Sequence, residues 1–323
     1  MTLSSASDTE AALRRPSHLE QLGRWLLDSG YRFVTVTPAT HARVNARAGV
    51  VEARGIEDVF GWSRPFRREL LPANVLAWLD ADGMIEERSG LCRTRVRYST
   101  LGGDLFVHSA FPTTAADAVF FGPDTYRFAS LISATLGSHS ATSRRCVVDV
   151  GCGSGAGGIV AARAGGMPGR LILADINPTA LRHARVNAAL AGIGAEFVQC
   201  DLFSGIDAPI DLIVANPPYL VDPQARVYRD GGGARGSALS LRIVHEGLER
   251  LAPGGMLVLY TGSCIVRGED LLHSSVVDAT RDAGATLAYS EIDPDVFGEE
   301  LALTGYDDVD RIAVIAAVIT TRR

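Results

Sequence analysis

The stretch Val147–Gly158 reads VVDVGCGSGAGG, and it decides the fold of the chain. Hydrophobic residues and Asp149 run into Gly151, Gly153 and Gly155, and a helical stretch, 159–164, follows. The pattern predicts a strand, a tight glycine turn and a helix. Glycine lacks a Cβ and tolerates φ > 0, so such a turn brings bare backbone and a helix N-terminus close to a ligand. The glycine turn alone does not identify the ligand, because dinucleotide-binding sites use nearly the same turn.

Length and composition favour a globular protein of two domains. The chain has 323 residues, of which 47% are hydrophobic and 21% charged, enough for a full core. No apolar run reaches the length of a membrane span, and the first residues lack the order of a signal peptide. We expect residues 1–15 to be a flexible tail. The five cysteines include no C-x-x-C pair, which favours reduced thiols in a cytoplasm over disulfides or a zinc site.

The charge pattern weighs against a general nucleic-acid binder. All 31 basic residues are arginine, and the net charge is −6. The first 100 residues carry 14 arginines against 12 acids, and the remainder carry 17 against 25. Neither part has a strong basic excess, although a local arginine patch on the first domain stays open. The acidic residues between 293 and 310 match no standard calcium loop, so we interpret them as a solvated surface and expect no metal site.

Residues 16–115 predict a small α+β domain. We expect helices over 16–30, 56–60 and 70–82, a strand over 32–37, and a hairpin of 93–98 with 105–108 around Gly102-Gly103. Helices followed by a hairpin suggest a winged-helix-like module. Such a module could recruit a protein or nucleic-acid substrate, or it could be a structural cap on the second domain.

The segment 118–128, AVFFGPDTYRF, leads into the second domain. Its Gly122-Pro123 pair predicts a loop. The loop is either an ordinary packed linker or the mouth of a ligand pocket. In the second case Phe121, Asp124, Thr125 and Tyr126 would line the mouth.

From residue 144 onward strands and helices alternate, which predicts a doubly wound, seven-stranded Rossmann-like α/β sheet over 116–323. We expect strands at 147–150, 171–174, 196–198, 212–215, 256–260, 287–292 and 312–319, and helices at 178–191, 240–251 and 269–283. In such a sheet the ligand lies at the carboxyl ends of the parallel strands.

Two carboxylates fall at those strand ends. Asp175 ends the second strand, where a carboxylate accepts hydrogen bonds from ribose hydroxyls. Asp201 ends the third strand and could accept the exocyclic amine of an adenine. Either could instead be a surface acid or a helix cap, and up to this point an NAD site is equally possible.

The next stretch, Asn216-Pro217-Pro218-Tyr219, directly follows the fourth strand. Here the sequence resembles the class I methyltransferases that use S-adenosylmethionine, and within them the amino-methyltransferase branch marked by N-P-P-Y. The resemblance implies S-adenosylmethionine as cofactor. The implied cofactor-binding residues are Asp149, Gly151, Gly153, Gly155, Asp175, Ile176, Asp201, Leu202 and Asn216.

The same resemblance implies methyl transfer to nitrogen, with Asn216, Pro217 and Tyr219 as catalytic residues. The Asn216 side-chain oxygen and the Pro217 carbonyl would accept the two N–H bonds of the acceptor nitrogen and turn it toward the methyl group. The prolines would fix the backbone, and Tyr219 would stack on the planar acceptor. Positioning beside a good leaving group then supplies much of the rate.

Similarity to the HemK/PrmC glutamine methyltransferases extends from about residue 120 to 259. It is carried by Pro123-Asp124-Thr125 before the glycine turn, by 228–232, and by Leu241-Arg242. This adds Tyr228 to the expected pocket mouth. Before residue 118 the chain departs from that family, whose recruiting domain is short and all-helical.

The acceptor stays open among a protein glutamine amide, a nucleobase amine in RNA and a small-molecule amine. One alternative is a natural-product alkyltransferase or cyclase that uses the cofactor's own amine, with methylthioadenosine as its product. Another is a degenerate module that binds the cofactor to recruit a partner. We expect a bacterial, cytoplasmic enzyme without membrane or metal, and the sequence predicts no oligomeric state.

Overall fold

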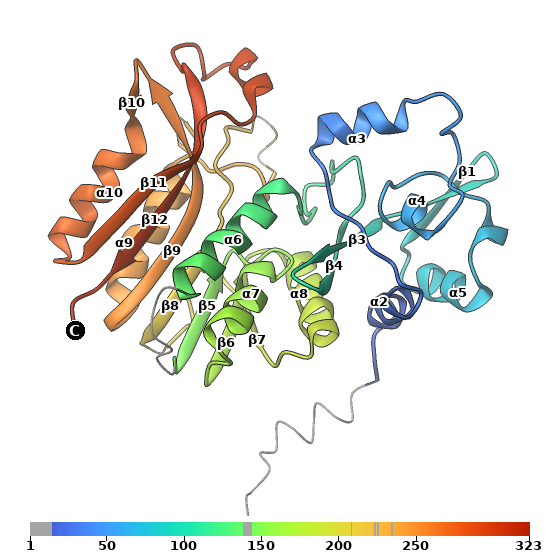
Figure 1. Cartoon of the computed structure of the whole chain (residues 1–323), viewed down its shortest axis with the longest axis horizontal. Coiled ribbons are helices and arrows are strands. Elements are labelled where there is room, and N and C mark those ends of the chain that lie inside the picture. The colour runs from blue at the N-terminus through green and yellow to red at the C-terminus, as the bar shows by residue number, and fades with distance from the viewer. Residues whose placement is uncertain (1–14, 138–143, 208, 223, 225, 234) are drawn as a thin grey trace, which may run out of the picture.

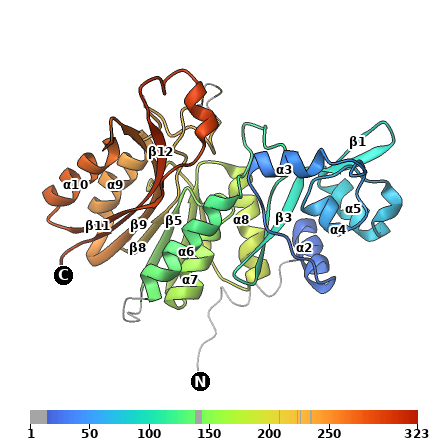
Figure 2. The same cartoon turned by 45° about the horizontal axis from the view of Figure 1, so that its top comes forward.

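The computed structural model describes residues 15–137, 144–207, 209–222, 224, 226–233 and 235–323. The chain forms an N-terminal α+β part and a larger part built on one sheet, which lie side by side (Figures 1 and 2). All but the last residue of the expected tail, 1–15, lies outside the described residues. No helix in the described ranges combines the length and the apolar character that a membrane span requires.

The larger part confirms the predicted α/β fold. Its strands are β5 (Cys146–Val150), β6 (Arg170–Asp175), β7 (Glu196–Gln199), β8 (Ile210–Ala215), β9 (Leu251–Val266), β10 (Glu269–Asp270), β11 (Thr286–Asp293) and β12 (Arg311–Thr320). Within the described residues the sheet order is β11-β12-β9-β8-β5-β6-β7, and the short β10 adds to β9. Strands β5 to β9 are parallel, whereas β12 lies antiparallel between β9 and β11.

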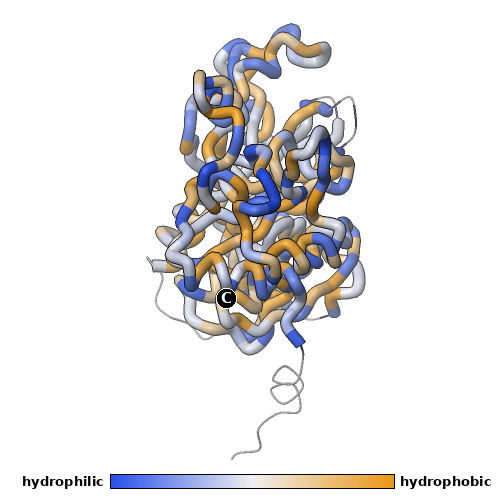
Figure 3. Tube along the Cα trace, turned by 90° about the vertical axis from the view of Figure 1, so that its right-hand side faces the viewer, coloured by the Kyte–Doolittle hydropathy of each residue, from blue (hydrophilic) through white to orange (hydrophobic). Residues whose placement is uncertain are grey.

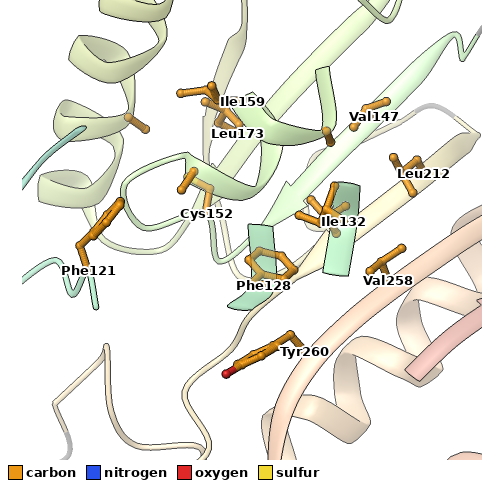
Figure 4. Packing of buried hydrophobic residues seen from close by; sticks show 14 of the residues in the cluster. Phe121, Phe128, Ile132, Val147, Cys152, Ile159, Leu173, Leu212, Val258 and Tyr260 are labelled. Atoms are coloured by element: carbon orange, nitrogen blue, oxygen red, sulfur yellow. The ribbon is translucent and has the colours of Figure 1, made fainter. Parts of the chain in front are cut away.

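Helices cover both faces of this sheet (Figure 1). They are α6 (Pro123–Gly137), α7 (Ala156–Gly165), α8 (Pro178–Ala191), α9 (Ala238–Arg250), α10 (Leu271–Asp282) and the short η2 (Gly298–Ala302). Because strand side chains alternate, Val147 packs with α6 to α8 while Val148 packs with α9 and α10. Figure 4 shows Phe128 and Ile132 of α6 against the first of these cores. Figure 3 shows hydrophobic and hydrophilic stretches alternating along the chain.

The N-terminal part has its own core. It contains α2 (His18–Asp28), α3 (Pro38–Asn45), α4 (Ile56–Phe60), η1 (Arg68–Leu70), α5 (Ala73–Ala81) and the hairpins β1 (Ile85–Arg88) with β2 (Leu91–Thr94) and β3 (Val96–Leu101) with β4 (Asp104–Ser109). The helices expected near 16–30 and 56–60 and the turn at Gly102-Gly103 are confirmed. Leu22, Phe60 and Tyr98 lie at the centre of the core.

Three expectations were wrong in detail. Residues 32–37 are not a strand, although the Phe33 carbonyl accepts a hydrogen bond from the Thr100 N–H at 2.8 Å. The strand expected over 93–98 is divided between β2 and β3. The loop expected over 118–128 ends at Gly122, because α6 begins at Pro123. A proline suits the first position of a helix, where its missing N–H costs no hydrogen bond.

Asn187 of α8 joins the two parts. Its fully buried side chain accepts a hydrogen bond from the Val107 N–H at 2.7 Å and donates to the Val107 carbonyl at 3.1 Å. The same amide donates to the Ser154 carbonyl of the glycine turn at 2.8 Å. One side chain therefore connects hairpin β3–β4, helix α8 and the glycine turn.

We expect Asn187→Ala to lower the free energy of unfolding by roughly 2–4 kcal/mol, because it leaves buried backbone groups of Val107 and Ser154 without partners. Urea denaturation of the full chain measures this loss. The exposed Asn74 of α5 provides a matched control, and Asn74→Ala should change the stability by less than about 0.5 kcal/mol. Equal midpoints for the two variants would show that Asn187 does not hold the parts together.

Candidate active site

The glycine turn between β5 and α7 has the geometry that its sequence predicts. Gly151, Gly153 and Gly155 have φ values of 64°, 53° and 77°, a region that other residues rarely adopt. A Cβ on Gly157 would lie 2.6 Å from the Phe128 ring. The first glycines therefore make the turn, and Gly157 lets α7 pack closely on α6.

Two carboxylates hold the turn in place. Asp149 accepts a hydrogen bond from the Gly158 N–H at 2.7 Å, and Asp175 accepts one from the Gly153 N–H at 2.8 Å. The second oxygen of Asp175 accepts the Asn177 N–H at 2.8 Å. Burial raises the pKa of both carboxyl groups, and these N–H donors act in the opposite direction.

A cavity of about 660 Å³ opens beside this turn, at the carboxyl ends of β5, β6 and β8. It is large enough for a nucleoside-sized ligand with a second small group. Most of the predicted site residues line it: Asp124, Thr125, Asp149, Gly151, Gly153, Asp175, Ile176, Asp201, Leu202, Asn216, Pro217, Tyr219 and Tyr228.

Three predicted site residues do not line the cavity. The Phe121 ring stacks on His108 at 5.0 Å between centroids and is buried in the core. Tyr126 points toward the N-terminal part, where its hydroxyl oxygen accepts the Thr35 N–H at 3.1 Å. Gly155 forms the N-cap of α7 and faces Leu173 and Ala184. Helix α6 explains the position of Tyr126, because it turns only Asp124, Thr125 and Phe128 of its first residues to the cavity. Phe121 precedes this helix and packs on Phe106 and His108.

Asp201 lies at the cavity edge, and it has a partner there. Arg242 of α9 donates to both of its carboxylate oxygens, at 3.1 and 3.4 Å. Both side chains are about half exposed, so the ion pair is weak. Its carboxylate can still accept a further hydrogen bond from a ligand.

The segment Asn216–Tyr219 enters the cavity directly after β8. Within the described residues neither the Asn216 side chain nor the Pro217 carbonyl has a hydrogen-bond partner, although Asn216 is partly buried. The backbone of the segment is packed tightly, since a Cβ on Gly231 would lie 2.7 Å from the Pro218 carbonyl oxygen. The backbone of the segment is therefore fixed at the cavity wall, with Asn216 partly exposed there.

Tyr219 was expected to stack on the acceptor, but its side chain is bound within the protein. Its hydroxyl donates to Asp124 at 2.7 Å, and Asp124 also accepts the Tyr260 hydroxyl at 2.8 Å and Arg127 at 3.1 Å. Its ring is only 7% exposed and packs on Gly262 of β9. Burial raises the pKa of Tyr219 well above its usual range, and Asp124 raises it further, so the hydroxyl stays protonated and donates.

Sequence reasoning missed several residues of the cavity wall. Those with aromatic or arginine side chains are Phe111, Phe120, Phe128, Arg226, Arg229 and Phe297. Phe120 is the neighbour of the predicted Phe121. The sequence therefore identified the segment but not the residue that faces the cavity. Phe111 and Phe297 carry no motif that would have marked them.

Three of the seven acidic residues between 293 and 310 pair with arginines. Arg127 pairs with Asp293 at 2.9 Å, Arg235 pairs with Asp308 at 2.8 Å, and Arg229 pairs with Glu300. Among the described residues, no group of three or more histidine, cysteine or acidic side chains could hold a metal ion.

We expect Tyr219→Phe to lower the free energy of unfolding by about 1–3 kcal/mol, because buried Asp124 loses one of its donors. Thermal or urea unfolding of the full chain measures the change. Tyr289→Phe is the control, since it removes a tyrosine hydroxyl bond to Asp270 of 2.7 Å outside the cavity, at a part-buried position. An unchanged midpoint for Tyr219→Phe would exclude this anchoring role.

Comparison with known proteins agrees with this geometry. The family described as "Methyltransferase small domain" matches residues 128–278, a little under half of the chain. A release factor glutamine methyltransferase of Deinococcus radiodurans is 38% identical over 124 residues, which cover 35% of this chain and 44% of the relative. A ribosomal RNA small subunit methyltransferase C of Serratia proteamaculans is 30% identical over 159 residues, which cover 49% and 40%.

The chain thus spans less than half of the length of these two curated relatives. Among solved structures, Trm5b from Pyrococcus abyssi has a TM-score of 0.50 at 14% identity, and the match covers 74% of this chain and 62% of that one. This likeness concerns the fold alone. Residues 128–278 thus match the methyltransferase small domain family, and the strand order of the sheet agrees with the Rossmann-like fold of S-adenosylmethionine-dependent methyltransferases.

Proposed function

We propose that the chain is an S-adenosylmethionine-dependent methyltransferase that acts on a nitrogen atom. One observation carries the proposal. The Asn216 amide and the Pro217 carbonyl, without hydrogen-bond partners among the described residues, share a cavity with the glycine turn and Asp175. The names of two relatives also support methyl transfer, since one is a glutamine methyltransferase and the other a ribosomal RNA methyltransferase.

The residues around the glycine turn fit the cofactor. Gly151 and Gly153 expose backbone to the cavity, since a Cβ on either would meet no atom within 4 Å. Asp175 has carboxylate lone pairs left for ribose hydroxyls after its two backbone bonds. The apolar Ile176 and Leu202 suit the faces of an adenine, and Asp201 lies beside them on the cavity edge. When bound, S-adenosylmethionine supplies an electrophilic methyl group on a positively charged sulfur.

Asn216 and Pro217 would act on the acceptor nitrogen. The nitrogen of an amide or an arylamine is a poor nucleophile, because its lone pair is delocalised. Two fixed oxygen acceptors would bind its hydrogens, orient the lone pair and stabilise the positive charge that grows on it during attack. Because the acceptors are held before the substrate arrives, little reorganisation is needed at the moment of reaction.

Buried contacts support this segment from behind. Tyr219 is anchored on Asp124, and Leu220 exchanges backbone hydrogen bonds with Arg229 and Gly231 at 3.2 and 2.9 Å. Pro217 and Pro218 restrict the backbone further. The positions of Asn216 and the Pro217 carbonyl therefore depend on a rigid support.

We also propose that residues 16–115 form a domain that selects the acceptor, within a bacterial cytoplasm. Pro38, Phe111 and Thr113 of this part line the cavity on the side of Tyr228. The five cysteines are free thiols, as a reducing compartment would keep them. The two curated relatives described above come from bacteria.

The first experiment identifies the acceptor class. Full-length protein is incubated with S-adenosylmethionine labelled on the methyl group and with separate protein, RNA and small-molecule fractions of a bacterial lysate. We expect label in one fraction and S-adenosylhomocysteine as the coproduct. Methylthioadenosine instead would show alkyl transfer or cyclisation, and no transfer to any fraction would contradict the proposed activity.

Asp175 should determine cofactor affinity. We expect Asp175→Ala to weaken S-adenosylmethionine binding by about 10- to 100-fold, which is roughly 1–3 kcal/mol of lost charged hydrogen bonds. Asp117→Ala is the control, because the Asp117 side chain bonds the Thr179 hydroxyl but does not line the cavity. Calorimetric titration compares the two, and equal affinities would remove Asp175 from the cofactor site.

Asn216 should act on turnover and not on the cofactor. We expect Asn216→Ala to lower the single-turnover rate by about 100-fold, as a lost positioned polar group does elsewhere. The affinity for S-adenosylmethionine should stay within a few fold. Rates are measured with the acceptor fraction found above. Lost cofactor binding would indicate a cofactor-holding role, and an unchanged rate would exclude the nitrogen contact.

A further inference from the structure

We propose that Phe297 determines which acceptors the chain takes, because its ring forms the cavity wall beside Tyr219. This inference rests on the proposed function and adds a specificity-determining residue to it. Phe297 lines the cavity and lies on the connection between β11 and β12, residues 294–310, which projects beyond these strands in Figure 1. The connection lies outside residues 128–278, which match the methyltransferase small domain family. Phe297 is therefore a feature of this chain and not of the matched region.

The backbone at Phe297 has a conformation that disfavours phenylalanine. Its φ and ψ are 55° and 38°, in the left-handed region that glycine and asparagine tolerate better. It is also the N-cap of the short helix η2, a position where serine, threonine, asparagine or aspartate can accept a backbone hydrogen bond and phenylalanine cannot. Two local rules therefore favour asparagine here. We interpret a residue that breaks both as one retained for function.

The other residues with a positive φ support this interpretation. Within the described ranges, the non-glycine residues of this kind are Ser63, Ser89, Leu202, Arg267 and Phe297. Two of them lie in the tight turns of the hairpins β1–β2 and β9–β10, each directly before a glycine. The two hydrophobic ones, Leu202 and Phe297, both line the cavity. Leu202 follows Asp201 near the end of β7, whereas Phe297 contacts Tyr219 after β8.

Two contacts place the connection against the segment that begins with Asn216–Tyr219. The Phe297 ring meets the Tyr219 ring edge-on, with the centroids 6.0 Å apart. Further along the connection, the hydroxyl oxygen of Tyr306 accepts the Val221 N–H at 2.8 Å. Tyr306 is 2% exposed, so water does not compete for this hydrogen bond. The Phe297 ring is thereby held next to the segment that would bind the acceptor nitrogen.

Hydrogen bonds and an ion pair fix the backbone on both sides of Phe297. Before it, the Val296 N–H donates to the Ile312 carbonyl of β12 at 2.9 Å. After it, the Glu300 N–H donates to the Phe297 carbonyl at 2.8 Å. The buried Glu300 carboxylate pairs with Arg229, which also lines the cavity. The partly buried Phe297 ring can therefore contact a ligand at a low cost in conformational entropy.

A ring at this place affects the acceptor in two ways. Its apolar face adds contact area to an acceptor that reaches Tyr219, and its bulk excludes acceptors that are too wide for the cavity at this point. Both effects are the same in the bound complex and in the transition state, so they change KM and not kcat. Asn216, by contrast, would act on turnover. The two residues therefore have different kinetic signatures.

The test compares Phe297→Asn with the unchanged full-length protein. Asparagine suits the backbone at this position but removes the ring, so we expect the melting temperature to change by less than about 3 °C. The affinity for S-adenosylhomocysteine should stay within about twofold, because the ring lies on the acceptor side. With methyl-labelled S-adenosylmethionine and the lysate fraction that accepts the label, the apparent KM for the acceptor should rise about 5- to 50-fold, while kcat stays within about threefold.

Specificity is measured in whole bacterial lysate, where the labelled products are separated by electrophoresis and chromatography. Phe297→Asn should label species that the unchanged protein leaves unlabelled, whereas Phe297→Tyr keeps the ring and should restore the original KM and labelling pattern. Phe197→Leu is the matched control and should change neither. Phe197 of β7 is also partly buried on the same core, but it does not line the cavity. If Phe297→Asn does not fold, Phe297→Leu replaces it.

Two results would overturn the inference and leave the proposed function intact. An unchanged KM and labelling pattern in the folded variant, with or without a lower melting temperature, would show that the ring only packs. Weakened S-adenosylhomocysteine binding with an unchanged acceptor KM would assign the ring to the cofactor. Transfer of the labelled methyl group to no fraction by the unchanged protein would instead contradict the proposed function, and this inference with it.

Discussion

The site depends on one buried carboxylate, Asp124. It accepts hydroxyl hydrogens from Tyr219, after the fourth parallel strand, and from Tyr260 within the fifth, and an Arg127 bond from its own helix. Burying a carboxylate costs free energy unless hydrogen-bond donors surround it. The fold therefore brings these three donors together at Asp124. Helix α6, the Asn216–Tyr219 segment and β9 are thereby fixed relative to one another. The Asn216 side chain and the Pro217 carbonyl, which have no hydrogen-bond partner among the described residues, are then positioned by packing.

The N-terminal part contributes to this arrangement from the other side. Asn187 ties hairpin β3–β4 to the Ser154 carbonyl of the glycine turn, and Tyr228 reaches the Thr113 carbonyl. Phe111 and Thr113 then complete the cavity wall. The cavity wall near Tyr228 is thus shared between the two parts, whereas the glycine turn and Asp175 belong to the larger part alone.

The part of the site that could be predicted from the sequence lies around the glycine turn. Gly151, Gly153 and Asp175 could be placed from the sequence, because a positive φ and a strand end admit few residue types. The sheet could also be predicted, because the alternation of strands and helices is a local pattern in the sequence. Phe120 and Phe121 show where this reasoning ends. Both are aromatic neighbours, and Phe121 is the one in the core because its ring packs on Phe106 and His108 of β4, a contact that the local sequence does not reveal.

Tyr219 shows the same limit for a strong motif. The four residues N-P-P-Y identify the segment, and Asn216 and Pro217 line the cavity. They say nothing about the hydroxyl of Tyr219, whose partner lies 95 residues earlier in the chain. Once that hydroxyl is committed to Asp124, the ring cannot turn freely toward an acceptor. The ring then supports the backbone of the segment from behind, and Asn216 and Pro217 are the residues of the motif that remain at the cavity for a ligand.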